Sequence, residues 1–553
     1  MPGIIQTHLR VGMKFLGLLS SRPDLPTRFC AARCVTPEAL ARQGSPILNF
    51  KMGFQSSALP VPLWLALPIG SFLLYCIGTI VYNLFLHPLR SYPGPWLWRV
   101  SSLPWKFALL KGTMHHDLMR FHQVYGDTVR IKPDEISYAN AQAWKDIHAH
   151  VPGRPEFLKD PIRLPLAPNG IMSILVSDTK NHARFRSLFG HAFSDKGLRA
   201  QEANIIKYAD LLVDVLRDEA ADKGKSVEMV YYFNMGIFDS IGALAFGESF
   251  NSLKDRTLHP WVDAIHKNLK SVAISHVLRS MGIEFMTPYV LPRELRGKRA
   301  ENYAYAIQKV KGRMQKTGDQ GDFWDRVIVK SDNDNESGQG MSPGEMLNNA
   351  AVMVVAGSET TSSALCGATY LLCRFNRMQK AAEEIRTAFA RSEDIDLLKV
   401  SQLKYLTAVI DETLRMYPAV PGQPPRVVPE GGAIVCGKFV PEETRVGVSH
   451  LGSYFAHYNF SNPNEFIPER FINKKDPAFA NDDFAAYQPW SIGVRNCIGR
   501  NLAYAELRLT LAKLIWNFDI TLDEEKTGNF LDQKIWSIWA KRELYVSIKA
   551  RQH

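Results

Sequence analysis

The sequence predicts a mainly α-helical protein: one membrane-spanning helix followed by a single large domain. Residues 201–220, QEANIIKYADLLVDVLRDEA, repeat apolar residues at i, i+3, i+4 and i+7, as amphipathic helices do. Residues 342–375 predict a long helix that is apolar on nearly all sides. No side chain from Met52 to Leu86 carries a full charge. These three observations favour helices over sheets, and we find no internal repeat.

Composition narrows the class of protein further. The chain has 553 residues, of which 46% are hydrophobic and 22% charged, so it is globular with a large core. Its 7 cysteines are spread thinly, which argues against a disulfide-stapled secreted protein. The net charge is +11, and residues 1–59 contribute +5 of it. Such mild basicity suits a membrane surface or an acidic partner, so we expect no nucleic-acid partner.

Residues 60–86 predict a transmembrane anchor. Their core, VPLWLALPIGSFLLYCIGTIVYNLFL, is 26 residues long, and a bilayer needs only about 20. That length exceeds the apolar region of a signal peptide; a buried core helix is the alternative. Pro88, Pro93 and Pro95 follow and forbid continued helix. Residues 87–97 are therefore predicted to form a rigid proline-rich hinge before the domain at 98–553.

Within the N-terminal extension at residues 1–59, residues 1–51 allow two interpretations. They carry arginines, few acids and no strong periodicity, which a transit peptide would explain. Alternatively, translation starts at Met52 and most of this extension is not made. Arg90, Arg99, Lys106 and Lys111 would then follow a span with an uncharged leading flank. The positive-inside rule in that case places the domain in the cytosol.

The long apolar helix has a recognisable start. Ser342, Pro343, Gly344 and Glu345 match a capping box with proline at the first helical position. The helix should run to about Phe375 through the centre of the domain.

The stretch PWSIGVRNCIGR, residues 489–500, sets one cysteine between glycines and cations. The residues after Cys497 have helical periodicity, so the helix N-terminus is expected to stabilise a thiolate there. Gly493 and Gly499 permit a tight turn and close approach of a flat ligand. Arg495 suits a carboxylate. The set fits a haem with a cysteine axial ligand, although a plain glycine turn ahead of a helix would also explain it.

Here the chain resembles the cytochrome P450 family, whose haem loop follows the pattern F-x-x-G-x-R-x-C-x-G. Trp490, Gly493, Arg495, Cys497 and Gly499 stand in those places, with tryptophan where phenylalanine is usual. The resemblance covers roughly residues 87–548. It implies the cytochrome P450 fold, mainly α with a smaller β part, and haem b whose iron is bound by Cys497. We expect Trp490 to alter the tuning of the iron without abolishing ligation.

Two further family motifs lie upstream of the loop. DETLR places Glu412 and Arg415 on one helix face, and PERF follows with Arg470. By resemblance the three form a buried charge network that holds the loop of Cys497. A surface ion pair is the ordinary alternative for such spacing.

The motif AGSETT, residues 356–361, resembles the oxygen-activation segment of the family. Small Ala356 and Gly357 would leave room for dioxygen. Glu359 and Thr360 would be the catalytic acid–alcohol pair that relays protons. The alternative is helix packing, with the hydroxyl bonded back to the i−4 carbonyl.

The haem propionates need cations or donors. His182 and Arg186 lie at i and i+4 in NHARFRSLFGHAF, and Arg426 lies in QPPRVVPEGG. By resemblance these three join Gly493, Arg495 and Cys497 as residues that bind the cofactor.

The resemblance implies a haem-thiolate monooxygenase that takes electrons from NADPH through a cytochrome P450 reductase, with cytochrome b5 as a second donor. The chain is similar to fungal microsomal members of secondary metabolism, of the isotrichodermin C-15 hydroxylase and averantin hydroxylase types. The expected reaction inserts one atom of O2 into a lipophilic terpenoid or polyketide, in a single-pass protein of the endoplasmic reticulum membrane. An oxygen-independent isomerase or dehydratase, and a non-catalytic membrane haem protein, are the alternatives. The intact Glu359–Thr360 pair disfavours both.

Overall fold

The computed structural model describes residues 61–167, 169–221, 225–316, 318, 320–333, 338–422 and 425–551. The chain divides into two compact units, Met1–Pro68 and Ile69–His553. The described part of the first unit is the beginning of one helix. The predicted extension at residues 1–59, with the candidate start at Met52, lies outside the described residues.

Most of the described chain is helical, as predicted. The α-helices are α1 (Val61–Val81), α2 (Trp96–Val100), α3 (Leu103–Lys111), α4 (Met114–Tyr125), α5 (Ala141–His148), α6 (Thr179–Phe189), α7 (Asp195–Leu216), α8 (Met229–Phe246), α9 (Ser252–Asp255), α10 (Pro260–Ser280), α11 (Thr287–Val290), α12 (Arg293–Met314), α13 (Asp325–Asn333), α14 (Pro343–Arg374), α15 (Met378–Ala388), α16 (Leu397–Val400), α17 (Lys404–Met416), α18 (His450–Tyr454), α19 (Glu469–Ile472), α20 (Arg500–Asn517) and α21 (Glu524–Thr527). The amphipathic pattern at 201–220 falls within α7 and the π-helical turn that follows it, Arg217–Ala221.

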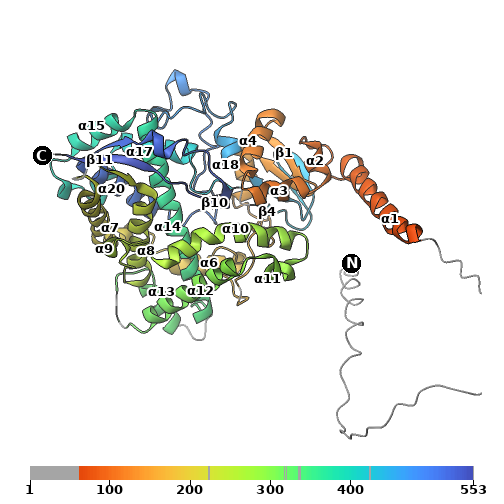
Figure 1. Ribbon diagram of the computed structural model, residues 1–553, viewed down its shortest axis with the longest axis horizontal. Coiled ribbons are helices and arrows are strands. Elements are labelled where there is room, and N and C mark those ends of the chain that lie inside the picture. The colour runs from red at the N-terminus through yellow and green to blue at the C-terminus, as the bar shows by residue number, and fades with distance from the viewer. Residues whose placement is uncertain are drawn as a thin grey trace, which may run out of the picture. The chain divides into compact units, whose positions relative to one another are not determined.

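The smaller β part is present too. The strands are β1 (Thr128–Lys132), β2 (Glu135–Tyr138), β3 (Ser226–Glu228), β4 (Arg426–Val427), β5 (Ala433–Val435), β6 (Lys438–Val440), β7 (Arg445–Val448), β8 (Phe518–Leu522), β9 (Ile535–Trp536), β10 (Ile538–Trp539) and β11 (Tyr545–Ala550). One sheet has the order β1-β2-β7-β4, with β2 and β7 parallel, and a second has the order β3-β11-β8. In Figure 1 the first sheet lies with α2, α3, α4 and α18, apart from the helical body that holds α7, α8, α14 and α20.

Two described helices are long and apolar enough to cross a membrane. Residues Ala66–Leu86, in α1 and the π-helical turn Tyr82–Leu86, form an apolar stretch of which only 6% is buried. Helix α8 passes the same test of length and composition but is 89% buried. Helix α8 is therefore a core helix, and only the first stretch presents its apolar side chains outward.

The predicted hinge is docked on the domain. Leu89 and Tyr92 are buried, and the backbone N–H of Arg130 donates to the carbonyl of Pro93 at 2.7 Å. Helix α2 already begins at Trp96, so the proline-rich segment ends earlier than the predicted boundary at residue 97. Pro93 has no backbone N–H to donate, but its carbonyl can still accept a hydrogen bond. The bond from Arg130 therefore holds the proline-rich segment against β1.

Helix α14 begins as the sequence predicts. The Ser342 hydroxyl accepts from the backbone N–H of Glu345 at 3.3 Å, and the Glu345 carboxylate accepts from the N–H of Ser342 at 2.8 Å. The helix continues for 32 residues to Arg374 and packs against α8, α12, α17 and α20. The prediction of a capped, central, buried helix is confirmed.

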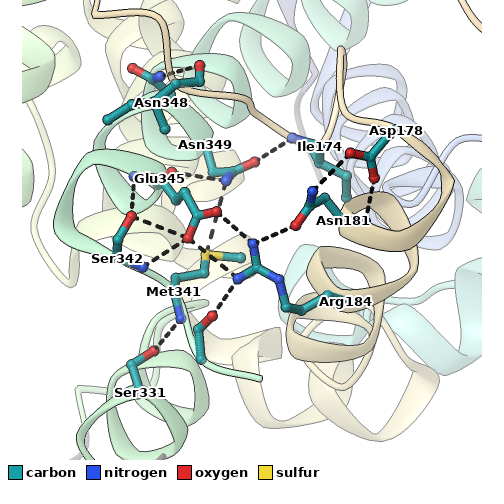
Figure 2. Close-up of polar contacts among 12 residues, drawn as sticks. Ile174, Asp178, Asn181, Arg184, Ser331, Met341, Ser342, Glu345, Asn348 and Asn349 are labelled. Atoms are coloured by element: carbon teal, nitrogen blue, oxygen red, sulfur yellow. Dashed lines mark hydrogen bonds and ion pairs between the residues drawn. The ribbon is translucent and has the colours of Figure 1, made fainter. Parts of the chain in front are cut away.

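Glu345 also binds a second helix. Its carboxylate accepts from both terminal nitrogens of Arg184 on α6, at 2.5 and 3.3 Å, as Figure 2 shows. Arg184 in turn donates to the side chain of Asn181, which is held by Asp178 at the start of α6. A bidentate guanidinium–carboxylate pair fixes direction as well as distance. Helix α6 is therefore held in one orientation against the start of α14.

Two asparagines on α14 hold the segment that precedes α6. Asn349 accepts from the backbone N–H of Ile174 at 2.7 Å (Figure 2). Asn348 donates to the carbonyl of Ile171 at 2.8 Å and exchanges side-chain bonds with Asn169. Because irregular backbone must satisfy its polar groups elsewhere, these amides replace the bonds a strand would make. The start of α14 thus holds α6, one wall of the site described next, and the segment that leads into α6.

Candidate functional site

The loop that carries Cys497, residues 487–499, is closed on itself and on α5. The backbone N–H of Cys497 donates to the carbonyl of Trp490 at 2.8 Å. Gly493 has φ +78°, and a Cβ there would lie 2.0 Å from the carbonyl oxygen of His148. Any side chain at Gly493 would therefore combine backbone strain with a steric clash.

Replacing Gly493 by alanine should destabilise the protein by more than the ~1–3 kcal/mol that left-handed strain alone costs. The extra loss comes from the contact with the His148 carbonyl, which has to move. Urea denaturation of purified protein measures the loss, and haem content reports the state of the loop. Gly153→Ala is the matched control, since Gly153 has φ +77° and no atom within 4 Å of its Cβ position. Equal losses in the two variants would contradict the proposed clash.

The surroundings of Cys497 only partly favour the expected thiolate. Helix α20 begins only at Arg500, with Gly499 as its N-cap. Burial raises the pKa of the Cys497 thiol, and the N–H of Gly499 with the charges of Arg186 and Arg500 only partly offsets this effect. The helix N-terminus therefore lies where the sequence predicts it and favours the thiolate through the Gly499 N–H, although the side chain of Cys497 itself is exposed. A metal ion bound at the sulfur would stabilise the thiolate further, because it deprotonates a coordinating thiol outright.

Beside this loop lies a cavity of about 550 Å³. Its walls come from the end of α5, the segment after it, helix α6 and the cysteine loop. The lining residues are Ile147, His148, Ala149, His150, Val151, Arg154, Pro155, Glu156, Phe157, Thr179, His182, Ala183, Arg186, Arg426, Gly493, Val494 and Asn496. The sequence prediction named four of these: His182, Arg186, Arg426 and Gly493.

Arg426 is buried at this cavity with part of its guanidinium unused. Its Nη1 donates to the carbonyl of Phe157 at 3.1 Å, while its Nε is buried without a hydrogen-bond partner. Burial and the charge of Arg495 lower its pKa to about 10. Lys159 nearby is affected in the same way, and burial with Arg426 and Arg495 lowers its pKa to about 7. Several buried positive charges that lie close together favour the binding of an anionic ligand.

Arg495 lies in this cluster but is already paired. Its guanidinium binds both carboxylate oxygens of Glu156, and its Nη1 donates to the carbonyl of Ser177 at 2.8 Å. Thr179 also donates to Glu156, at 2.8 Å. Glu156 could not be predicted from the sequence, because a single acid in GRPEFLKD carries no spacing signal.

His182 and Arg186 lie on one face of α6, as their spacing predicts. Burial and the charges of Arg495 and Arg186 lower the pKa of His182 to about 4, so its ring is neutral at pH 7. Arg186 donates to both the backbone carbonyl and the side chain of Asn496. Helix α6 is thereby fastened to the cysteine loop from the side opposite α14.

These residues fit haem. Three cations, Arg426, Arg495 and Lys159, surround one carboxylate, Glu156, and the buried Nε of Arg426 needs an acceptor. A flat group with two carboxylates would balance this charge, and Gly493 keeps the loop free of a side chain. The cysteine sulfur provides the axial ligand that iron requires.

Glu412, Arg415 and Arg470 come together in the core, each fully buried. Glu412 accepts from Arg415 at 2.7 and 2.8 Å and from Arg470 at 3.2 Å. The remaining donors of Arg415 bind the carbonyls of Tyr454, Pro463 and Glu465. Arg470 binds Asp482 and the carbonyl of Ser461. A buried network is tolerable only when its charges and donors are satisfied in this way.

Two connections lead from α17 to the cysteine loop. The hydroxyl of Tyr454, whose carbonyl binds Arg415, accepts from the N–H of Gln488 at 3.0 Å. Asp411, beside Glu412, accepts from the hydroxyls of Tyr487 and Tyr504.

Trp490, the departure from the family pattern, joins the second connection. Its indole N–H donates to the Tyr504 hydroxyl at 3.3 Å. Phenylalanine could not make this bond, so Trp490 fastens the loop to α20 through a contact that the usual residue lacks.

The AGSETT segment lies in the middle of α14 with its residues on different faces. Ala356 is exposed and Thr360 half-buried, and the Thr360 hydroxyl donates to the Ala356 carbonyl at 2.6 Å. A Cβ on Gly357 would lie 2.6 Å from Ile241 on α8. Gly357 therefore permits close helix packing, and the expectation that it clears space for dioxygen is wrong. Glu359 is 2% exposed and binds His266 and Lys541, two residues that the sequence analysis did not single out.

The comparisons agree with this geometry. The family model for Cytochrome P450 matches residues 92–546. A versicolorin B desaturase of Emericella nidulans is 77% identical over 494 residues, which are 88% of this chain and 99% of that protein. A versicolorin B desaturase of Aspergillus parasiticus is also 77% identical, over 88% of this chain and 97% of its own length. An averantin hydroxylase of Dothistroma septosporum is 42% identical over 87% of this chain and 91% of its own length.

The prediction of a fungal secondary-metabolism oxidoreductase is confirmed, and relatives named desaturase, hydroxylase and monooxygenase do not favour the two alternatives. With its family model and its relatives in agreement, the chain belongs to the cytochrome P450 family.

Proposed function

We propose that this enzyme desaturates versicolorin B or a near analogue of it. The observation that carries the proposal is the 77% identity to versicolorin B desaturases of two fungi, over 88% of this chain. A polyketide substrate was one of the two classes expected from the sequence, and the relatives favour it over a terpenoid.

Desaturation and hydroxylation need the same cofactor, the same oxidant and the same source of electrons. Haem b bound through Cys497 would supply dioxygen activation with two electrons from NADPH. In desaturation the substrate loses two hydrogens from adjacent carbons, and both oxygen atoms leave as water. In hydroxylation one oxygen atom stays in the product and one leaves as water. Both outcomes consume protons, which this chain has to deliver.

Different residues of the chain would bind the cofactor, support the cysteine loop and transfer protons. Arg426, neutral His182 and Arg186 would hold the two carboxylates of the cofactor, with Arg495 exchanging part of its pairing to Glu156. The network of Glu412, Arg415 and Arg470 keeps the cysteine loop in place. Glu359 and Thr360 are proposed as the proton-handling pair. Their side chains lie on different faces of α14, so the proton has to cross the helix from the Glu359 side to the Thr360 side.

The test supplies versicolorin B, NADPH, a fungal reductase and oxygen-18 gas to membranes containing the enzyme. We expect a product two hydrogens lighter than the substrate, with no labelled oxygen. Insertion of an oxygen atom is the second candidate, favoured by the 42% identical averantin hydroxylase. It would give a heavier product that carries the label. Conversion that proceeds without NADPH would contradict both.

The proposal includes a membrane anchor at residues 60–86, preceded by the extension at 1–59 and followed by the hinge. The exposed apolar side chains of Ala66–Leu86 support it. Arg90, Arg99, Lys106 and Lys111 after the span favour a domain in the cytosol, on the endoplasmic reticulum. The electron donors would be NADPH–cytochrome P450 reductase and cytochrome b5. Exposed Arg500, at the start of α20, is the cation that such acidic partners could reach.

A further inference from the structure

Glu359 points away from Thr360 into a polar cluster built from four elements. Its carboxylate contacts Nε2 of His266 on α10 at 2.9 Å and Nζ of Lys541, after β10, at 3.0 Å. Lys541 also donates to Asn234 on α8 at 2.9 Å and to Ser362 on α14 at 2.8 Å. All three donors of the ammonium group are thereby engaged, and Lys541 is fixed.

The two partners of Glu359 differ in their access to water. The side chains of Glu359 and Lys541 are only 3% and 2% exposed, whereas that of His266 is 30% exposed. His266 is therefore the contact through which this buried carboxylate reaches the outside of the protein.

A cavity of about 430 Å³ opens at His266. We call it the Glu359 cavity. Its lining residues are Glu228, Val230, Tyr231, Asn234, Leu258, Asp263, His266, Lys267, Leu269, Ala540, Lys541, Arg542 and Glu543. It shares none of these with the cavity beside Cys497, and because it opens to solvent beside several charged side chains we take it to hold water.

The charges around His266 come from every wall. Asp263 and Lys267 lie on its own helix, Glu228 at the end of β3, and Lys541, Arg542 and Glu543 on the segment after β10. Asp263 and Lys267 pair with each other at 3.0 Å. Burial alone would raise the pKa of Glu359, but Lys541 and His266 outweigh it and lower the pKa to about 2.

A carboxylate held in this way is ionised at neutral pH, and because its pKa is low it holds a proton only while passing it on. A group beside it that takes protons from water and passes them inward would complete a path from solvent to α14. Histidine is suited to that task because it changes charge near neutral pH.

We propose that the Glu359 cavity is the proton-entry route of the enzyme and that His266 passes protons from its water to Glu359. In each transfer the N–H bond at Nε2 of the imidazolium breaks and an O–H bond forms at a Glu359 oxygen. The imidazole ring then turns so that its free Nε2 takes a proton from a hydronium ion in the cavity water, and no electrons move. Lys541 is a positioning residue that keeps the carboxylate in reach of His266. The inference rests on the oxidation proposed above, since forming water from dioxygen consumes these protons.

The first experiment compares wild-type enzyme with His266→Gln, which keeps an N–H donor near Glu359 but cannot carry a proton. We expect product formation at neutral pH to fall at least about ten-fold and to lose its dependence on pH. The rate should also slow more in heavy water than the wild-type rate does. The carbon-monoxide spectrum and thermal midpoint should stay unchanged. His457→Gln, the same exchange at an exposed histidine, is the matched control and should behave as wild type.

A double variant separates a proton path from a packing effect. Residues that act in series are not additive, so Glu359→Gln with His266→Gln should be no slower than Glu359→Gln alone. Losses that multiply would overturn the proposal, as would a His266→Gln enzyme with the wild-type pH profile.

Carbethoxylation followed by mass spectrometry tests the route without turnover and without a variant. In the folded holoenzyme, His266 should react with diethyl pyrocarbonate, whereas fully buried His122 should not. An unreactive His266 would overturn the proposal even if His266→Gln fails to fold. If wild-type enzyme leaves versicolorin B unchanged, the proposed function fails. The proton route is then judged from His266 reactivity and from the pH dependence of NADPH consumption.

Discussion

Replacing Cys497 by serine is expected to remove the thiolate-shifted Soret band of the reduced, carbon-monoxide-bound protein and to lower turnover to the background of the assay. Serine keeps the size and the loop conformation, including the N–H bond to the Trp490 carbonyl. It cannot supply the soft, anionic sulfur that the iron needs as its axial ligand. The effect on catalysis should therefore be complete while the fold survives.

The measurement is an absorbance spectrum of the reduced protein with carbon monoxide, together with product formation and a thermal melt. Cys373→Ser is the control, because Cys373 is a half-buried free cysteine on α14 outside the loop. It should keep both band and turnover. A shifted band that persists in Cys497→Ser would mean that another residue binds the iron.

The second large effect is expected at Arg415. Replacement by leucine leaves Glu412 with Arg470 as its only cation in the network and removes the donors to the carbonyls of Tyr454, Pro463 and Glu465. Breaking a buried ion pair on one side costs about 3–5 kcal/mol. Since whole domains are stable by only about 5–15 kcal/mol, the variant should be poorly folded at 37 °C and should lose haem.

Urea denaturation and haem content measure the effect of Arg415→Leu. Arg391→Leu is the matched control, because Arg391 and Asp394 form an exposed pair with the same i, i+3 spacing. It should change neither quantity measurably. Arg415→Lys retains the charge but not the fork of donors, and should give an intermediate loss. Wild-type stability in Arg415→Leu would show that the network does not hold the core together.

Patterns between residues that are close in the sequence were sufficient to predict the start of α14 and part of the candidate site. Ser342 and Glu345 lie within one turn, so the capping box could be recognised and the start of α14 predicted to the residue. His182 and Arg186 were placed on one face by their spacing alone. In both cases the interacting residues are close in the sequence, and helical geometry fixes the rest.

The partners that were missed lie far away along the chain. Arg495 and Glu156 are separated by 339 residues, and Glu359 and Lys541 by 182. No periodicity connects such positions, and a lone glutamate or lysine looks like surface charge. Gly357 was misjudged for a related reason. Its small size serves contact with Ile241 on α8, a neighbour that appears only once the two helices pack.

The contact between Arg186 on α6 and Asn496 of the cysteine loop spans 310 residues of chain. Ribosomes add roughly 5–20 residues per second, so the α6 wall is made roughly 15–60 s before the loop that completes the pocket. During that interval the cofactor pocket is incomplete, because the Asn496 side of this contact has not yet been made. A chain truncated before Cys497 lacks both this contact and the proposed iron ligand, so it is expected to bind no haem.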